Sequence, residues 1–254
     1  MSGKSIMSES FRSKSGFLLV IFFIYVVLFE FILPVNRVLP MPHMLFESFL
    51  YIWEGYNILQ AIAITSSIVY FSLVVSYFII RLFAGRLIQL SIEYPGPVEK
   101  LKIFRYFPSF FFAILFAYWF EDSIAAEFLF GLLSSLLMIA GSLLNSSRSF
   151  NKTYFEAGLN MHLSRPEVYS KIVYKQIQPV FFSDLFRIHY YLWILVMIYE
   201  FICGIEGFGG IYRTALLYND YAGLFSIAVV ISILILIGSS VIKYIDEKIF
   251  FWEE

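Results

Sequence analysis

The sequence predicts an all-α, polytopic membrane protein with six transmembrane helices and one polar, helical loop. The 254-residue chain is 60% hydrophobic and 20% aromatic, whereas soluble domains have an apolar share of roughly 45–50%. The apolar residues gather in six runs, most of them long enough to cross a bilayer as a helix. A charge-rich stretch at residues 153–179 separates the fourth run from the fifth.

The first run is predicted to remain as a membrane span, because it exceeds the apolar core of a signal peptide and lacks a cleavage site of small residues. After the prolines that follow it, residues 43–54 show an amphipathic pattern that predicts a helix along the membrane interface. Residues 1–15 are assigned to a cytoplasmic N-terminal tail and residues 16–254 to a single transmembrane domain. The predicted spans lie at about residues 16–34, 57–83, 106–120, 123–144, 180–204 and 222–241.

The distribution of Lys and Arg predicts the orientation of the chain. Fifteen of the eighteen Lys and Arg residues fall in the N-terminal tail, in residues 81–105, in and just before the polar loop, and in the C-terminal tail. Loops rich in Lys and Arg stay on the cytoplasmic side of a membrane. Both termini and the polar loop are therefore predicted to be cytoplasmic.

Composition and motifs argue against several classes of function. A net charge of −1 does not suit nucleic-acid binding, which needs a concentrated basic surface. The single cysteine, Cys203, permits no intrachain disulfide and no thiolate metal cluster, and His189 has no partner ligand that would make it a metal site. A membrane enzyme would need a nucleophile and a base, and no such motif is found. No catalytic, cofactor-binding or metal residue is predicted.

The polar loop is predicted to fold as two short helices in tandem. Thr153 and Glu156 have the spacing of a capping box, in which the two side chains satisfy backbone amides at a helix start. Ser164 and Glu167 repeat this spacing, and Pro166 is tolerated in a first helical turn. Polar tandem helices between two membrane spans indicate a surface for a soluble partner.

Residues 156–179 align, without a gap, with a loop that reads Glu-Ala-Ala, three residues, Gly-Ala-Ser, and that ends near a Leu-Pro and a second Pro. Tyr174-Lys175 replaces the Leu-Pro, and Pro179 is the second proline. This pattern resembles the membrane subunit of bacterial ABC importers, in the subgroup that takes up nitrate, aliphatic sulfonates, taurine and some vitamin precursors. His162 stands in place of the loop glycine, which supplies a positive φ that His also tolerates. The matching positions are Glu156, Ala157, Gly158, Met161, His162, Leu163, Ser164, Tyr169, Val173 and Pro179.

The resemblance extends beyond the loop, over roughly residues 38–252. Leu39–Pro42 is similar to the family's Leu-Pro-Ser-Pro after the first span. Arg105–Pro108 and the Trp119-Phe120 pair are similar to its motifs around the third span. Glu200, ahead of the glycine-rich segment Gly207–Gly210, matches the end of the fifth span.

The resemblance implies the fold of a type I ABC importer permease in a bacterial inner membrane. It also implies three partners: a separate ABC ATPase that binds ATP and Mg, an external solute-binding protein, and a second permease copy in a homodimer. The loop would dock a coupling helix into the ATPase, with Glu156 pairing with a basic group and with Ala157 and Gly158 allowing close approach. The alternative is that Glu156 only caps its own helix. No residue pattern in the spans identifies the transported solute.

Ionisable residues within the predicted spans are candidates for the translocation path or a gate. Asp184 and Arg187 are spaced i, i+3 and are expected to pair on one helix face, with gating as the alternative role. Glu200 either lines the path or a gate, or contacts interfacial water or a neighbouring helix. Glu30 and Glu127 are expected near the membrane interfaces.

The alternative function is that of an ion-coupled secondary transporter, or of another six-span protein without an ATPase partner. Secondary transporters usually show internal repeats, and none is found in this sequence. They would also have no use for cytoplasmic tandem helices at residues 153–179.

Overall fold

The computed structural model describes residues 16, 19–32, 40–96, 100, 109–120 and 123–249. Every regular element within these residues is helical, as the sequence predicted, and none is a strand. Two π-helical segments and one 3₁₀ turn accompany the α-helices. The elements are η1 (Val27–Ile32), α2 (Pro42–Gly55), α3 (Ile58–Glu93), α5 (Ser109–Trp119), α6 (Ile124–Ser146), η3 (Ser147–Ser149), α7 (Lys152–Asn160), α8 (Arg165–Glu167), η4 (Val168–Val173), α9 (Tyr174–Cys203), α10 (Phe208–Leu217) and α11 (Tyr221–Ile249).

Four helical stretches in the described residues are long and apolar enough to cross a membrane. This confirms the prediction of a helical membrane protein, while the count of six spans stays a prediction. Two further apolar helices are shorter, at Leu19–Ile32 and Phe110–Trp119. The four long stretches are Ile58–Glu93, Ile124–Ser149, Arg165–Cys203 and Tyr221–Ile249.

Two helices extend further than the predicted spans. Helix α3 continues past residue 83 to Glu93, because the residues after the apolar run still favour a helix. Helix α9 begins at Tyr174 and passes through Pro179, and η4 precedes it without a break. Proline removes one helical hydrogen bond, but its position one turn into α9 leaves the helix continuous. The polar loop therefore runs directly into the long membrane helix.

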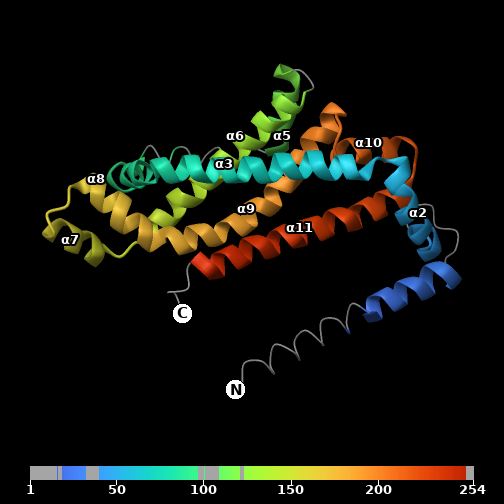
Figure 1. Ribbon diagram of the computed structural model, residues 1–254, viewed down its shortest axis with the longest axis horizontal. Coiled ribbons are helices and arrows are strands. Elements are labelled where there is room, and N and C mark those ends of the chain that lie inside the picture. Colours follow the sequence, from blue (N-terminus) through green and yellow to red (C-terminus); the bar gives the residue numbers. More distant parts are fainter. Residues whose placement is uncertain are drawn as a thin grey trace. The chain divides into compact units, whose positions relative to one another are not determined.

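The described residues form two compact units, one from residues up to 57 and 214–230, the other from residues 58–213 and 231–249. In the second unit, α3, α6 and α9 lie side by side (Figure 1). The α3–α6 contact is made by small residues: the Ser76 and Ser135 hydroxyl oxygens lie 2.5 Å apart, and Ser135 also donates to the carbonyl of Ser72. Small side chains allow membrane helices to approach closely.

Aromatic side chains fill the core where α5, α6 and α9 meet. The rings of Phe130 and Tyr199 stack with centroids 4.9 Å apart, and Phe116 packs against both. Ala113 and Leu195 complete this cluster. Tyr199 of this cluster directly precedes Glu200 in α9.

The first unit contains the predicted amphipathic helix as α2. The phenol of Tyr56 donates to Asp220, with the oxygens 2.8 Å apart, and Ser226 donates to the carbonyl of Leu45. Burial, together with the hydrogen bond to Asp220, raises the pKa of Tyr56, so the phenol stays a donor at neutral pH. Asp220 also accepts from the amide of Gly223 and so caps the start of α11.

Several sequence predictions lie outside the described residues. They are the N-terminal tail at residues 1–15, Leu39 of the motif after the first span, the Arg105–Pro108 motif and the last residues of the C-terminal tail.

Candidate functional site

The first of the two tandem helices, α7, begins earlier than predicted. Asn151 is its N-cap, and the Asn151 side-chain oxygen accepts from the amide of Thr153 at 2.9 Å. The predicted capping box of Thr153 and Glu156 was therefore wrong. Asn is as strong a capping residue as Ser or Thr, and its position two residues upstream moves Thr153 into the first turn of the helix. Glu156 does not cap α7.

The turn between the tandem helices has the geometry expected for the position of His162. His162 has φ +60°, which confirms that this position needs the left-handed region. The amide of Leu163 donates to the carbonyl of Gly158, and the amide of His162 donates to that of Leu159. This pair of bonds is a Schellman motif, the common way of ending a helix with a positive-φ residue.

The second tandem helix begins with the predicted capping residues. The backbone amide and the hydroxyl of Ser164 both donate to the Glu167 carboxylate, at 3.1 and 2.7 Å. Glu167 also pairs with Lys171 at 2.9 Å, and Arg165 lies 3.5 Å from Glu93 at the end of α3. These contacts fix α8 and η4 to the end of the helix bundle.

Gly158 is buried rather than part of an exposed docking surface, which corrects the prediction that it gives a partner a close approach. A Cβ at this position would lie 2.5 Å from Ile172 Cδ1 and 3.1 Å from Val168 Cγ2. The glycine thus allows α7 to pack on η4. Phe155 packs from the same helix onto the ring of Tyr169, with centroids 5.1 Å apart.

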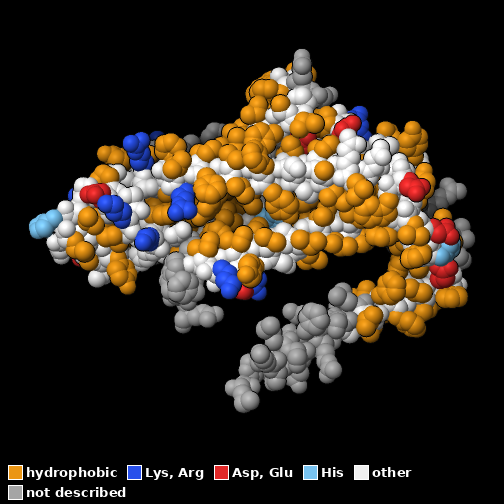
Figure 2. Space-filling view, viewed as in Figure 1, with side chains coloured by type: hydrophobic (Ala, Val, Ile, Leu, Met, Phe, Trp, Pro, Cys, Tyr) orange, Lys and Arg blue, Asp and Glu red, His pale blue; other side chains and the backbone are white. Residues whose placement is uncertain are grey.

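Three of the predicted residues are exposed on α7 and at its C-terminal end. Glu156 and Ala157 are exposed, and Met161 is 72% exposed. Within the described part of the chain, Glu156 has no hydrogen bond or ion pair. Lys and Arg side chains gather at this end of the second unit, whereas apolar side chains cover the length of α3 (Figure 2).

The structure pairs Asp184 with Arg187 at 2.9 Å, which confirms the predicted contact on one face of α9. Asp184 also accepts from the hydroxyl of Ser142 on α6, at 2.5 Å. The same carboxylate therefore links two helices of the bundle, near the end that carries the tandem helices.

Glu200 lies at the other end of α9, where its carboxyl group binds the glycine-rich turn. Its two carboxyl oxygens accept from the Thr65 hydroxyl at 2.5 Å and from the amide of Gly209 at 2.6 Å. Thr65 accepts in turn from the amide of Phe208. Gly207 has φ +146°, and a Cβ there would collide with the Glu200 carboxyl group, so glycine is required beside this carboxyl.

Glu127 lies in the first turn of α6, and its place near a membrane interface stays a prediction. Its side chain is completely buried within the protein, as is that of Glu200, and this burial was not predicted. A signal was available in the spacing, since Glu127, Gly131, Ser135 and Ile139 recur every four residues and all face the core. Glu30, by contrast, is partly exposed and lies 2.9 Å from His43.

His189 is a buried contact between helices. Its Nε2 accepts from the indole N–H of Trp193 at 3.0 Å, and its ring stacks on Tyr70. No group of three or more His, Cys, Asp or Glu side chains within the described residues has the arrangement of a metal site.

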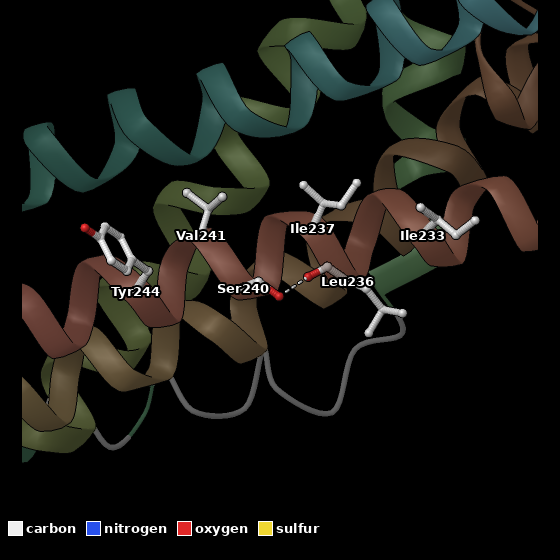
Figure 3. A pocket seen from close by; sticks show the side chains of 6 residues that line it. All are labelled: Ile233, Leu236, Ile237, Ser240, Val241 and Tyr244. Atoms are coloured by element: carbon white, nitrogen blue, oxygen red, sulfur yellow. Dashed lines mark hydrogen bonds between the residues drawn. The ribbon is translucent and has the colours of Figure 1, made fainter. Parts of the chain in front are cut away.

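The surface hollow along α11 offers little for recognising a solute. Figure 3 shows that one helix supplies all six lining side chains, and five of them are apolar or aromatic. The hydroxyl of Ser240 donates to the carbonyl of Leu236 one turn earlier, at 2.8 Å. Its polar group is thus satisfied within the helix, as expected for a surface in contact with lipid. The lining residues are Ile233, Leu236, Ile237, Ser240, Val241 and Tyr244.

The described helices define an integral membrane protein with a polar helical loop at one end of its bundle. The sequence profile of the binding-protein-dependent transport system inner membrane component family matches residues 101–251, more than half of the chain. The chain belongs to this family, the membrane-embedded permease components of ABC importers. No protein of curated function and no solved structure matches the chain significantly.

Proposed function

We propose that the chain is the permease of a type I ABC importer from the nitrate, sulfonate and taurine subgroup. It forms the translocation path for a small solute delivered by an external binding protein. ATP and Mg are bound by a separate ABC ATPase, which docks on the loop at residues 153–179. The observation that carries this proposal is helix α7, which is exposed on one side and packed on the other. It presents the carboxylate of Glu156, which has no ion-pair partner among the described residues.

The packing of the loop supports its role in transmitting motion. Helix α7 rests on η4 through Gly158, and η4 continues directly into α9. Arg165 connects the same loop to α3 through Glu93. A displacement of α7 by the ATPase therefore moves two membrane helices together rather than bending a flexible loop.

Six spans and a paired permease complete the proposed assembly. The apolar helices Leu19–Ile32 and Phe110–Trp119 are the candidates for the first and third spans. Both termini and the loop face the cytoplasm, in keeping with the distribution of Lys and Arg. A second copy of the chain supplies the other half of the translocation path.

Two polar contacts in the bundle are proposed to act in gating. Glu200 ties α9 to Thr65 of α3 and to the start of α10, so opening of that end requires these bonds to break. The Asp184–Arg187 pair, with Ser142, holds α6 and α9 together toward the cytoplasmic end.

Copurification with the ATPase tests the proposed docking site. We expect Glu156→Arg to abolish copurification of a coexpressed candidate ATPase, because it reverses the charge offered to a basic group on that partner. The matched control is Glu54→Arg, the same charge change at an exposed residue of α2, which should leave copurification intact. Undisturbed copurification with Glu156→Arg would refute the assignment of this residue.

A further inference from the structure

Two carboxyl groups from different helices meet in the interior of the second unit. Glu127 lies on α6 and Glu200 lies on α9, and both side chains have 0% of their surface exposed. The rings of Phe130 on α6 and Tyr199 on α9 stack with centroids 4.9 Å apart and hold the two helices together beside these residues, where the two carboxyl groups are near enough to interact. Glu200 lies directly beside the glycine-rich turn, since it accepts from the amide of Gly209 and a Cβ at Gly207 would collide with its carboxyl group.

The two groups differ sharply in the donors available to them. Glu200 accepts from the hydroxyl of Thr65 and from the amide of Gly209, and it lies at the N-terminal end of α10, where a helix favours negative charge. Neither oxygen of Glu127 meets a hydrogen-bond donor among the described residues. No ion pair between described residues includes either group.

An ionised Glu127 would be an uncompensated charge. A buried carboxylate without a partner is strongly destabilising, and a second carboxylate beside it adds repulsion. A protonated carboxyl group, however, has one O–H donor. If Glu127 carries the proton, its O–H has an acceptor in Glu200, and the only charge left is the one that Thr65 and Gly209 already stabilise.

We propose that Glu127 is a neutral carboxylic acid that donates a hydrogen bond to the Glu200 carboxylate, so that the two groups share one proton. Glu127 is then a positioning residue for the glycine-rich turn. It adds a third donor to the carboxylate that ties α9, α3 and the start of α10 together. The arrangement does not depend on which solute the chain transports or on the docking of an ATPase.

Infrared difference spectroscopy of the purified full-length chain at neutral pH tests where the proton resides. A protonated carboxyl group has a C=O stretching band distinct from that of a carboxylate. We expect Glu127→Gln to remove one such band and Glu200→Gln to retain it with a shifted frequency. The proposal is overturned if the unsubstituted chain lacks the band, or if Glu127→Gln leaves it unchanged.

Thermal unfolding tests the proposed hydrogen bond independently, with two substitutions of Glu127 by side chains of similar size. The amide of Glu127→Gln can donate to Glu200 in place of the acid, so its Tm should match that of the unsubstituted chain. Glu127→Met fills the same space without a donor and should unfold at a lower temperature. An equal fall in Tm for both variants would show that Glu127 acts as a charged group, against the proposal.

Discussion

At the scale of single residues, His162 shows how a non-glycine residue preserves a helix turn. The left-handed conformation at this position costs an L-amino acid roughly 1–2 kcal/mol. Here two backbone hydrogen bonds, from His162 and Leu163, close the end of α7. The same conformation occurs at Asn57 and Asn219, and Asn and His are among the side chains most often found in it.

Substitution of His162 tests this turn. We expect His162→Gly to keep or raise stability, because glycine adopts a positive φ without steric strain. His162→Val should lower the free energy of unfolding by about 1–2 kcal/mol, because a β-branched side chain disfavours this conformation. Denaturant unfolding in detergent measures both effects. Met161→Val, at a neighbouring exposed residue with negative φ, is the control, and an equal loss there would contradict the explanation.

Substitution of Thr65 measures how much its hydrogen bond to Glu200 contributes to stability. Thr65→Val keeps the side-chain shape but leaves a buried carboxyl oxygen and the amide of Phe208 without their partner, which should cost about 2 kcal/mol or more. Thr65→Ser retains the hydroxyl and should cost less. Thermal unfolding of the two variants compares their losses of stability. If serine and valine lower the Tm equally, the hydrogen bonds contribute little.

At the scale of elements, the contact between α7 and η4 determines whether the loop is a rigid unit. The side chain in Gly158→Leu would overlap Ile172 and Val168. We expect it to displace α7 and to reduce copurification of the ATPase, although Glu156 itself is unchanged. Ala157→Leu, at the exposed position just before Gly158, should leave the stability of the chain intact. A stable Gly158→Leu chain that still copurifies would show that this packing does not matter for docking.

The sequence predicted best those features of the structure that depend only on neighbouring residues. Apolar runs predicted the membrane helices, the positive φ at residue 162 followed from the place of glycine in the loop, and the spacing of Asp184 and Arg187 predicted their contact. In each case the structure depends on residues close together in the chain.

Contacts between distant segments were not predictable in the same way. Glu127 was expected near a membrane interface, and its burial inside the protein could not be predicted because it depends on how α6 packs against α9. Gly158 was read as a surface residue because the position of η4 was unknown. The start of α7 was misplaced because Asn151 and Thr153 are both good capping residues, and local pattern alone did not rank them.

At the scale of the whole molecule, the tandem helices and the buried polar contacts lie at different ends of α9. In the proposed function, motion of α7 would reach this helix through η4, which continues directly into α9. At the far end of α9, Glu200 accepts hydrogen bonds from Thr65 and Gly209. Such an arrangement suits a permease in which a cytoplasmic event opens a distant gate.

Uptake of solute into reconstituted vesicles is the most direct test of the central claim, that this permease is driven by an ATPase through the loop at residues 153–179. With the cognate binding protein and ATPase present, we expect uptake to require ATP, and Glu156→Arg to abolish it while Glu54→Arg does not. Uptake that proceeds without the ATPase, driven by an ion gradient, would contradict the claim.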